Sequence, residues 1–420
     1  MYQRTVLDNG LTIVTHPMPT TRSFGVALAT AVGGCHESDD EAGISHFIEH
    51  LCFKGTSRRP NPKDISAEIE GIGGILNAST GREETVYWAK VTRSHMTTAI
   101  DLLFDIALHS VFDPAEVEKE RQVVIEEINM SLDIPQQRVS MLIDTLLWPG
   151  QPLGRDVAGT KETVASISRE ALLGYVDAHY RSGNMVACVA GDVVHEDVCR
   201  EIELRCAGLR SGLTEQGYRT DPEQREPRVG VDTRDGEQAH VCLALHGVSR
   251  CDRRRYAADA LNVVLGGGMS SRLFTEIREK RGLAYDIHSY GEHFLSSGSL
   301  VIYAGVDPAR LEECVEALLQ ELTRLKAGVM EEELRRAKEL VKGRLELRLE
   351  DTQNAALWYG TQQLLNGEIL TIDEVCQRIE AVTLEDVSEV AEEFLTTQNL
   401  SLAVVGPVET VASPVLPPLR

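Results

Sequence analysis

Aromatic residues, basic residues and long apolar runs are all scarce in this chain. Of its 420 residues, 5% are aromatic, and 42 lysines and arginines stand against 65 acidic residues, which gives a formal net charge of -23. Nucleic-acid binding depends on cationic neutralisation of phosphates, so this charge argues against a nucleic-acid ligand. It favours cationic or neutral partners, although acidity also keeps a protein in solution. No run of 18 apolar residues occurs, so the sequence predicts no membrane-spanning helix.

Paired cysteines are missing as well. The nine cysteines include no C-x-x-C pair, and their odd number is typical of reduced thiols inside a cell. The first ten residues, MYQRTVLDNG, have neither an apolar signal core nor the arginine-rich pattern of a transit segment. The sequence therefore predicts a cytoplasmic location with no membrane anchor.

The segment 46–50, which reads HFIEH, is the most informative feature that is present. On a helix, the side chains of His46 and His50 lie one turn apart on the same face, so both imidazoles can reach one metal ion. Zn²⁺ accepts neutral imidazole nitrogens, and a catalytic zinc site keeps one position open for water. Glu49 is then the candidate base for that water. The order H-x-x-E-H inverts the zinc-peptidase motif H-E-x-x-H.

Residues on either side of this motif predict the helix that it requires. Ser38, followed three residues later by Glu41, resembles a capping box that would open the helix. Apolar residues recur at helical spacing from Ile44 to Leu51, and Gly55 is expected to end the helix.

A second helix, predicted over 115–131, carries candidates for the third metal ligand that two histidines still require. Asp113-Pro114 is typical of a helix start. Glu120 and Glu127 lie seven residues apart, two turns along one face, and either could complete the site. From spacing alone, the acidic run could equally be a solvated surface.

Together, the block 46–56 (HFIEHLCFKGT) and the segment 120–129 resemble the two metal helices of a known superfamily. It comprises the pitrilysin, insulin-degrading enzyme and mitochondrial processing peptidase type of zinc peptidases, and the half-length processing-peptidase-like members match this chain best. The resemblance implies one Zn²⁺ per chain, held by His46, His50 and Glu127.

The same resemblance implies roles for the neighbouring carboxylates. Glu49 would activate zinc-bound water for hydrolysis of peptides or unfolded polypeptides in an enclosed cavity. Glu120 matches a supporting glutamate, which we interpret as holding a ligand histidine in its metal-binding tautomer. Glu126 points about 100° away from Glu127 on a helix, so it is excluded as a ligand.

Two predicted strands, 73–80 and 85–91, lie between the metal helices. The first resembles the superfamily's edge strand, which binds extended peptides by strand addition. By this match Asn77 and Ala78 would contact substrate, and Phe53 would line a pocket just beyond the scissile bond. A core position for Phe53 and a turn position for Asn77 remain alternatives.

The second half of the chain has no H-x-x-E-H motif but contains a different signature over 265–285. By resemblance, Arg278 and Tyr285 would reach the zinc centre of a facing domain, with Tyr285 donating to the oxyanion of the reaction intermediate. The three glycines at 266–268 are not followed by G-K-[ST], so a nucleotide site is not expected.

An internal repeat predicts two homologous halves. The segment 167–193 aligns without gaps on 382–408, and each copy has the pattern of a helix that leads into a strand. We expect an N-terminal peptidase domain over 1–210 and a homologous domain over 235–420, joined by a polar linker over 207–238 that is rich in glycine and proline. The predicted fold class is α+β, with two α/β halves that each pack helices on one face of a largely antiparallel sheet.

Other functions stay open at this point. Some relatives are catalytically silent structural or assembly subunits, although those typically lack part of the zinc motif. Two histidines and a carboxylate also form the ligand set of non-haem iron oxygenases. Half-length relatives pair, so a homodimer is expected, with a heterodimer containing a related subunit as the alternative. Asp133 is the only acid between positions 128 and 141, which argues against presequence-type arginine specificity.

Overall fold

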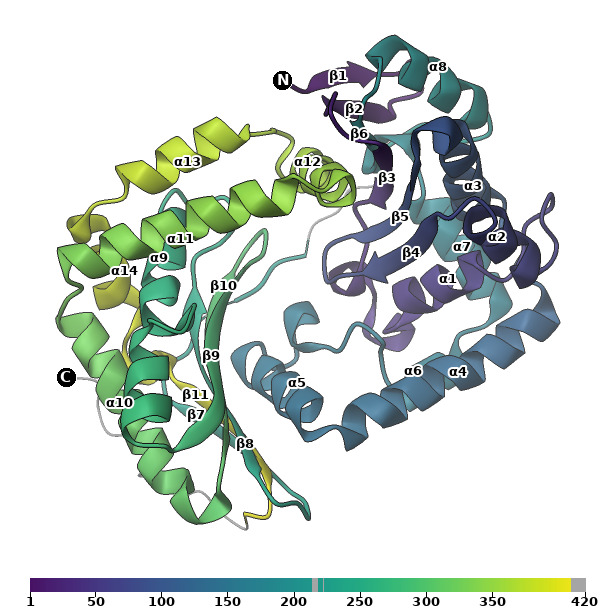
Figure 1. The fold of residues 1–420 in the computed structure, drawn as a ribbon. Helices are drawn as coiled ribbons and strands as arrows, with labels where there is room; N and C mark the ends of the chain where they lie inside the picture. The colour runs from purple at the N-terminus through teal and green to yellow at the C-terminus, as the bar shows by residue number, and fades with distance from the viewer. Residues whose placement is uncertain (214–217, 222, 409–420) are drawn as a thin grey trace. The chain divides into compact units, whose positions relative to one another are not determined.

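Two β-sheets organise the chain, one in each of two units (Figure 1). The computed structural model describes residues 1–213, 218–221 and 223–408. The first unit comprises Met1–Asn129, Asp156–Tyr218 and Glu346–Thr371, and the second comprises Met130–Arg155, Arg219–Leu345 and Ile372–Arg420. Helices and strands are mixed in both units, which confirms the predicted α+β fold class.

The first sheet has six strands in the order β1-β2-β6-β3-β5-β4. Its neighbours pair antiparallel, except for β2 and β6, which are parallel. β4 lies at the edge, as the sequence predicts for the peptide-binding strand. The strands are β1 (Gln3–Val6), β2 (Thr12–Pro17), β3 (Ser23–Thr30), β4 (Ile75–Thr80), β5 (Thr85–Thr92) and β6 (Met185–Gly191).

The second sheet has five strands in the order β7-β11-β8-β10-β9. Only β7 and β11 are parallel, and β9 lies at the edge. The strands are β7 (Arg228–Thr233), β8 (Ala239–Gly247), β9 (Ala284–His293), β10 (Gly298–Val306) and β11 (Ser401–Gly406).

Helices cover both faces of the first sheet. Every residue of β3 from Phe24 to Thr30 is buried, and side chains alternate between the faces of a strand, so neither face is open to solvent. One face packs against α3, and the other packs Ala27 and Ala29 against α12. The helices of this unit are α1 (Ile44–Cys52), α2 (Pro62–Glu70), α3 (Met96–His109), α4 (Pro114–Asp133), α6 (Lys161–Ser166), α7 (Arg169–His179), α8 (His195–Arg205) and α12 (Thr352–Asn366).

The second sheet is covered in the same way. Its core contains α9, α10 and α14 on one face, and α5 contacts β8 and β11 from the other. Among the described residues, none of the helices combines the length and apolarity that a membrane span requires. The helices are α5 (Pro135–Leu147), α9 (Arg255–Gly266), α10 (Leu311–Ala327), α11 (Glu331–Leu349), α13 (Ile372–Ala381) and α14 (Leu384–Phe394), with a π-helix, η6, over Phe274–Lys280.

The structure confirms the internal repeat. Helix α7 covers 169–179 and α14 covers 384–394, so both bounds shift by 215 residues, and each helix leads into the strand that lies between a parallel and an antiparallel neighbour. The repeat continues through the exchanged helices, because α5 and α12 occupy equivalent places in it.

The division into units differs in one respect from a single cut in the linker. Segment 130–155 belongs with the second sheet and segment 346–371 with the first, so each sheet receives one helix from the other half of the chain. Asp351 anchors the second of these segments: it accepts from two N–H groups at the start of α12 and pairs with Lys90 of β5. Residues 214–217 and 222 of the predicted linker, and 409–420 of the predicted second domain, lie outside the described residues.

Candidate metal centre

Helix α1, which carries the HFIEH motif, spans Ile44–Cys52 and is shorter than the sequence predicts. The predicted capping box is wrong for this helix. Ser38 Oγ donates to Glu41 Oε2 at 2.7 Å, but Ser38 precedes a separate 3₁₀ turn over Asp39–Glu41. At the other end the helix stops before Gly55 is reached.

Glu37 caps α1 in place of the predicted serine. Its buried carboxylate accepts from the backbone N–H groups of Gly43 at 2.8 Å and Ser45 at 2.9 Å. A negative charge at this end also opposes the helix dipole. Gly43 makes the turn possible, because its φ is +94° and a Cβ there would lie 2.5 Å from the carbonyl oxygen of Ala158. The start of the metal-binding helix is therefore fixed by residues outside the motif.

Helix α4 supplies the acidic partner of this centre, and its start is as predicted. It begins at Pro114 and continues to Asp133, two residues past the predicted end. Asp113 Oδ1 accepts from the backbone N–H of Ala115 at 2.9 Å, which is the expected capping interaction.

The structure brings His46, His50 and Glu127 together as the metal-ligand set that the resemblance implies. Glu127 Oε2 lies 3.8 Å from His46 Nε2 and 3.4 Å from His50 Nε2. Two ligands bonded to one tetrahedral Zn²⁺ at about 2.0–2.1 Å lie roughly 3.3 Å apart, so these separations suit a shared ion. Within the described part of the chain, this is the one group of three such side chains that could hold a metal.

The electrostatics of the two imidazoles also suit a metal. Burial lowers the pKa of His46 to about 4, which keeps this ring neutral, and its Nδ1 is buried with no hydrogen-bond partner among the described residues. Burial would lower the pKa of His50 too, but the hydrogen bond to Glu120 and the charge of Glu127 outweigh it and raise the pKa. A cation in this place would replace the proton that these carboxylates favour.

Glu120 holds His50 in one tautomer. The Nδ1–H of His50 donates to Glu120 Oε1 at 2.9 Å, which leaves Nε2 free to bind a metal. Lys54 donates to the other oxygen, Oε2, at 2.7 Å. Burial would raise the pKa of Glu120, but hydrogen bonds from His50 and Lys54 outweigh it and lower the pKa. The sequence analysis missed Lys54, although it lies one helical turn after His50 in the matched block.

Weakening this pair is expected to loosen metal binding. Glu120→Gln and Lys54→Met should each lower the affinity for Zn²⁺ by about 10- to 100-fold, because outer partners orient the ligand histidine and raise its basicity. Competition with a chromophoric chelator measures this affinity. Lys119→Met, on the exposed side of the same helix, is the control and should leave it unchanged. Equal affinities in all four proteins would contradict this account of Glu120 and Lys54.

Glu49, the candidate base, projects from α1 toward the edge strand. Its Oε2 accepts from the hydroxyl of Thr80, the last residue of β4, at 2.6 Å. Burial raises the pKa of Glu49, and the nearby charge of Glu127 adds to the effect. A carboxylate with a raised pKa is a better proton acceptor at neutral pH. The sequence analysis did not single out Thr80.

The predicted substrate-contacting residues lie on and beside β4. Asn77 is exposed and Ala78 is half-buried, and Asn77 Oδ1 accepts from the backbone N–H of Ala78 at 2.8 Å. Because β4 ends the sheet, its outer edge has no neighbouring strand among the described residues. Phe53 is half-buried, and its ring centroid lies 6.4 Å from that of Tyr87.

Arg278 and Tyr285 lie in the second unit and are brought together there. The guanidinium carbon of Arg278 lies 4.3 Å from the ring centroid of Tyr285 and 4.8 Å from that of Phe274. These distances are typical of cation–π contacts. Arg278 lies in the π-helix η6, and Tyr285, on β9, is 77% exposed.

The second unit has no counterpart of the metal centre. The positions 215 residues after the two histidines and the glutamate of the motif are Leu261, Val264 and Leu265 on α9, and all three are buried in the apolar core. This agrees with the absence of a second H-x-x-E-H motif from the sequence.

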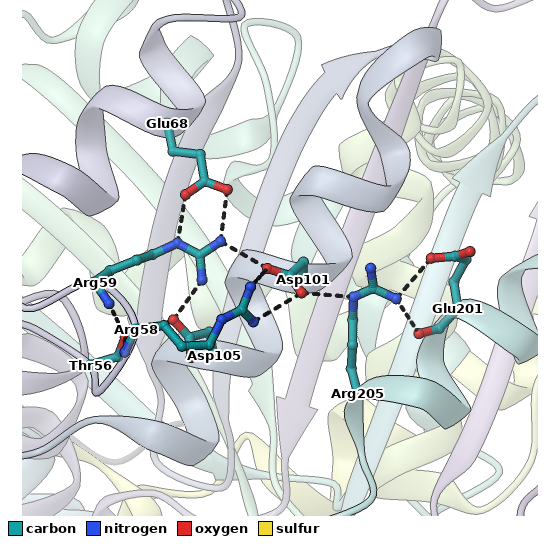
Figure 2. A network of polar contacts seen from close by, with 8 residues as sticks. All are labelled: Thr56, Arg58, Arg59, Glu68, Asp101, Asp105, Glu201 and Arg205. Carbon is teal, nitrogen blue, oxygen red and sulfur yellow. Dashed lines mark hydrogen bonds and ion pairs between the residues drawn. The ribbon is translucent and has the colours of Figure 1, made fainter.

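A network of charged side chains fastens the loop that follows α1 (Figure 2). The loop contributes Thr56 and Arg59, and both bond to the buried Asp105 of α3, at 2.7 and 2.6 Å. Arg59 also forms a two-point pair with Glu68 of α2, at 2.6 and 2.7 Å. Three arginines donate to the carboxylate of Asp101 at 2.8 to 3.1 Å, namely Arg58, Arg59 and Arg205.

Asp101→Asn is expected to destabilise the protein by about 3 kcal/mol at pH 7, because it leaves partly buried arginines without their counter-ion. Burial would raise the pKa of Asp101, but hydrogen bonds from Arg58 and Arg59 outweigh it and lower the pKa to about 2. A pKa below the ordinary value means that ionised Asp101 stabilises the fold fully above about pH 5, and that this contribution is lost as the pH falls through 4 towards 2.

Urea unfolding of the zinc-free protein at pH 7, 5 and 3 measures this effect on the first transition. The difference between wild type and Asp101→Asn should be the same at pH 7 and 5 and smaller at pH 3. Asp133→Asn, at an exposed position, is the control and should change little. A difference that does not shrink at pH 3 would show that the stabilisation does not depend on ionised Asp101.

Comparison with known proteins places the chain in a family. Residues 12–161 match the family model described as Insulinase (Peptidase family M16), and residues 166–341 match the one described as Peptidase M16 inactive domain. An uncharacterised zinc protease of Bacillus subtilis is 37% identical over 413 residues, which cover 97% of this chain and 98% of that protein. The chain belongs to peptidase family M16. This confirms the superfamily that the sequence motifs indicate.

Other M16 relatives match over nearly the whole chain. An uncharacterised zinc protease of Streptomyces coelicolor is 36% identical and covers 97% of this chain and 90% of its own length. A protease from Helicobacter pylori of solved structure has a TM-score of 0.89 at 23% identity, covering 97% of this chain and 99% of that one. A structure from Pseudomonas fluorescens, described as a peptidase M16 inactive domain, has a TM-score of 0.90 at 19% identity, with 98% and 99% covered. At these identities the structures support the fold alone.

Proposed function

We propose that this M16 chain is a zinc-dependent endopeptidase that hydrolyses peptides or unfolded polypeptides in an enclosed cavity. The observation that carries the proposal is the combination of a three-ligand metal group with a carboxylate base on one short helix. A base beside an open metal position is what peptide hydrolysis requires and what a structural metal site lacks.

His46, His50 and Glu127 would hold one Zn²⁺ per chain. Their nitrogen and oxygen atoms are the ligand types that zinc prefers, and three protein ligands leave a fourth position open. When bound, the ion would polarise the peptide carbonyl and lower the pKa of a coordinated water to about 7. Glu120 and Lys54 would keep His50 oriented.

Glu49 would move the proton. It accepts a proton from the attacking water as the oxygen bonds to the peptide carbonyl carbon, and it then passes that proton to the leaving amine nitrogen as the C–N bond breaks. Its raised pKa suits both transfers, since the protonated form must persist long enough to act as an acid. The site thus supplies base and acid from one carboxylate.

Substrate binding would use the free edge of β4. A peptide that adds as a further strand is held mainly by main-chain hydrogen bonds, which favour extended chains of varied sequence. Asn77 and Ala78 would contact the peptide beside the site, and Phe53 would line the pocket beyond the scissile bond. Arg278 and Tyr285 would complete the site, with Tyr285 donating to the developing oxyanion.

We further propose that two copies of the chain associate as a homodimer, with a heterodimer containing a related subunit as the alternative. A cytoplasmic location also stays a prediction. Sedimentation at micromolar concentration tests the first point: a fully active monomer would contradict the dimer.

The proposed activity is tested by mass-spectrometric mapping of products from a mixed peptide library, with and without a chelator. Internal cleavage that stops with the chelator and returns with Zn²⁺ is the expected result. A protein that retains zinc but cleaves nothing would favour the silent structural or assembly subunit instead. Cleavage that persists in full after verified removal of the metal would contradict the zinc mechanism.

A further inference from the structure

The edge strand and the base are joined by one side chain, Thr80, whose hydroxyl donates to Glu49 Oε2 at 2.6 Å. We propose that Thr80 is a positioning residue that holds Glu49 in its reactive orientation and couples this orientation to peptide binding on β4. The inference rests on the proposed peptidase function and adds a residue to which none of the sequence motifs assigns a role.

The direction of the Thr80 hydroxyl is set by the strand. Along β4, Leu76, Ala78 and Thr80 are half-buried, while the residues between them are exposed. Side chains alternate between the faces of a strand, so Thr80 shares a face with Ala78. A β-branched side chain has little freedom at χ1, and the position of the hydroxyl therefore follows the strand backbone closely.

Holding one carboxylate oxygen leaves the other available. Glu49 lies on α1 between the two metal-binding histidines in sequence, and rotation about its side-chain bonds could move the carboxylate away from them. The bond from Thr80 fixes Oε2, so Oε1 remains free to accept a proton from the attacking water. The backbone N–H of Thr80 also stabilises the ionised carboxylate, so loss of the hydroxyl alone weakens this restraint without abolishing it.

Peptide binding would strengthen the restraint. Thr80 is the last residue of β4 and pairs with Thr85 across the turn into β5, so its outer side is free. A peptide that pairs with this edge orders the strand end and, with it, the hydroxyl that holds Glu49. An extended peptide therefore helps to orient the base that attacks it, and the effect should appear in kcat rather than in KM.

Thr80→Val tests the proposal, because it removes the hydroxyl and keeps the shape and strand preference of the side chain. With a peptide that the wild type cleaves, we expect kcat to fall about 10- to 100-fold, since small misplacements of a catalytic group cost this much. KM, zinc affinity by chelator competition and the thermal midpoint should stay close to the wild-type values. Thr80→Ser, which restores a hydroxyl, should recover most of kcat.

Thr92→Val makes the same chemical change at the exposed far end of β5 and should have no effect on kcat. Unchanged kcat in Thr80→Val, or an equal loss in Thr80→Ser, would overturn the positioning role. A parallel loss of zinc affinity in Thr80→Val would also overturn it, because the effect would then act on the metal. A wild type that cleaves no peptide would refute the proposed function itself, which separates the two failures.

Discussion

Glu49→Gln is expected to lower kcat for peptide hydrolysis by about 1,000- to 10,000-fold while leaving zinc bound. General acid–base catalysis accounts for rate factors of up to about this size. Glutamine keeps the shape of the side chain and can still accept from Thr80, but its amide cannot take up the proton of the attacking water. Initial rates with a fluorogenic peptide, together with zinc content by mass spectrometry, measure both parts of the prediction.

The control for this variant is Glu70→Gln, the same change at an exposed position at the end of α2, which should leave kcat unchanged. If Glu49→Gln cleaves at the wild-type rate with zinc in place, Glu49 is not the base. If instead it loses its zinc, the variant reports on metal binding and the assignment of Glu49 to proton transfer is contradicted.

Glu127→Gln is expected to abolish zinc binding at submicromolar concentrations and, with it, all detectable cleavage. The charged oxygen 3.4 and 3.8 Å from the two imidazoles is lost, and a neutral amide is a poor zinc ligand. Removing a ligand should cost more than the roughly 10- to 100-fold loss of affinity expected for an outer partner such as Glu120.

The neighbouring Glu126 provides a matched control. It is exposed on α4, and its Oε1 accepts from Asn129 at 3.3 Å instead of facing the histidines. Glu126→Gln should therefore bind zinc and cleave peptides as the wild type does. The ligand assignment would be contradicted if both variants kept their zinc or if both lost it equally.

Local patterns predicted the elements that carry the site. Asp113 and Pro114 specify the start of α4 through a cap and a fixed φ, which act within a few residues. The alternation of β4 and β5, separated by a short turn, likewise predicted a paired hairpin. The choice of Glu127 as ligand was not local, because spacing left Glu120 equally open, and it came from the resemblance to the superfamily.

The partners that orient the site could not be predicted in this way. Thr80 meets Glu49 across 31 positions of sequence, and such a contact depends on how the strand and the helix pack. Glu37 displaced the predicted Ser38 cap because Gly43 turns the chain back toward its carboxylate. Lys54 lay in the matched block, but its partner Glu120 is on another helix.

The exchange of helices between the halves also depends on packing. Helices α5 and α12 have the apolar spacing of ordinary amphipathic helices, which shows that one face is buried but not which sheet buries it. Their place in the repeat, 215 residues apart, offered a signal that both behave alike, because the contacts of one should reproduce those of the other.

Stepwise addition of Zn²⁺ to the stripped wild-type protein, with cleavage of one peptide followed at each step, tests the central claim most directly. A single site formed by His46, His50 and Glu127 predicts that activity rises in proportion to added zinc and stops rising at one equivalent per chain. Full activity before any zinc is added, or one tightly bound equivalent that restores no cleavage, would contradict it.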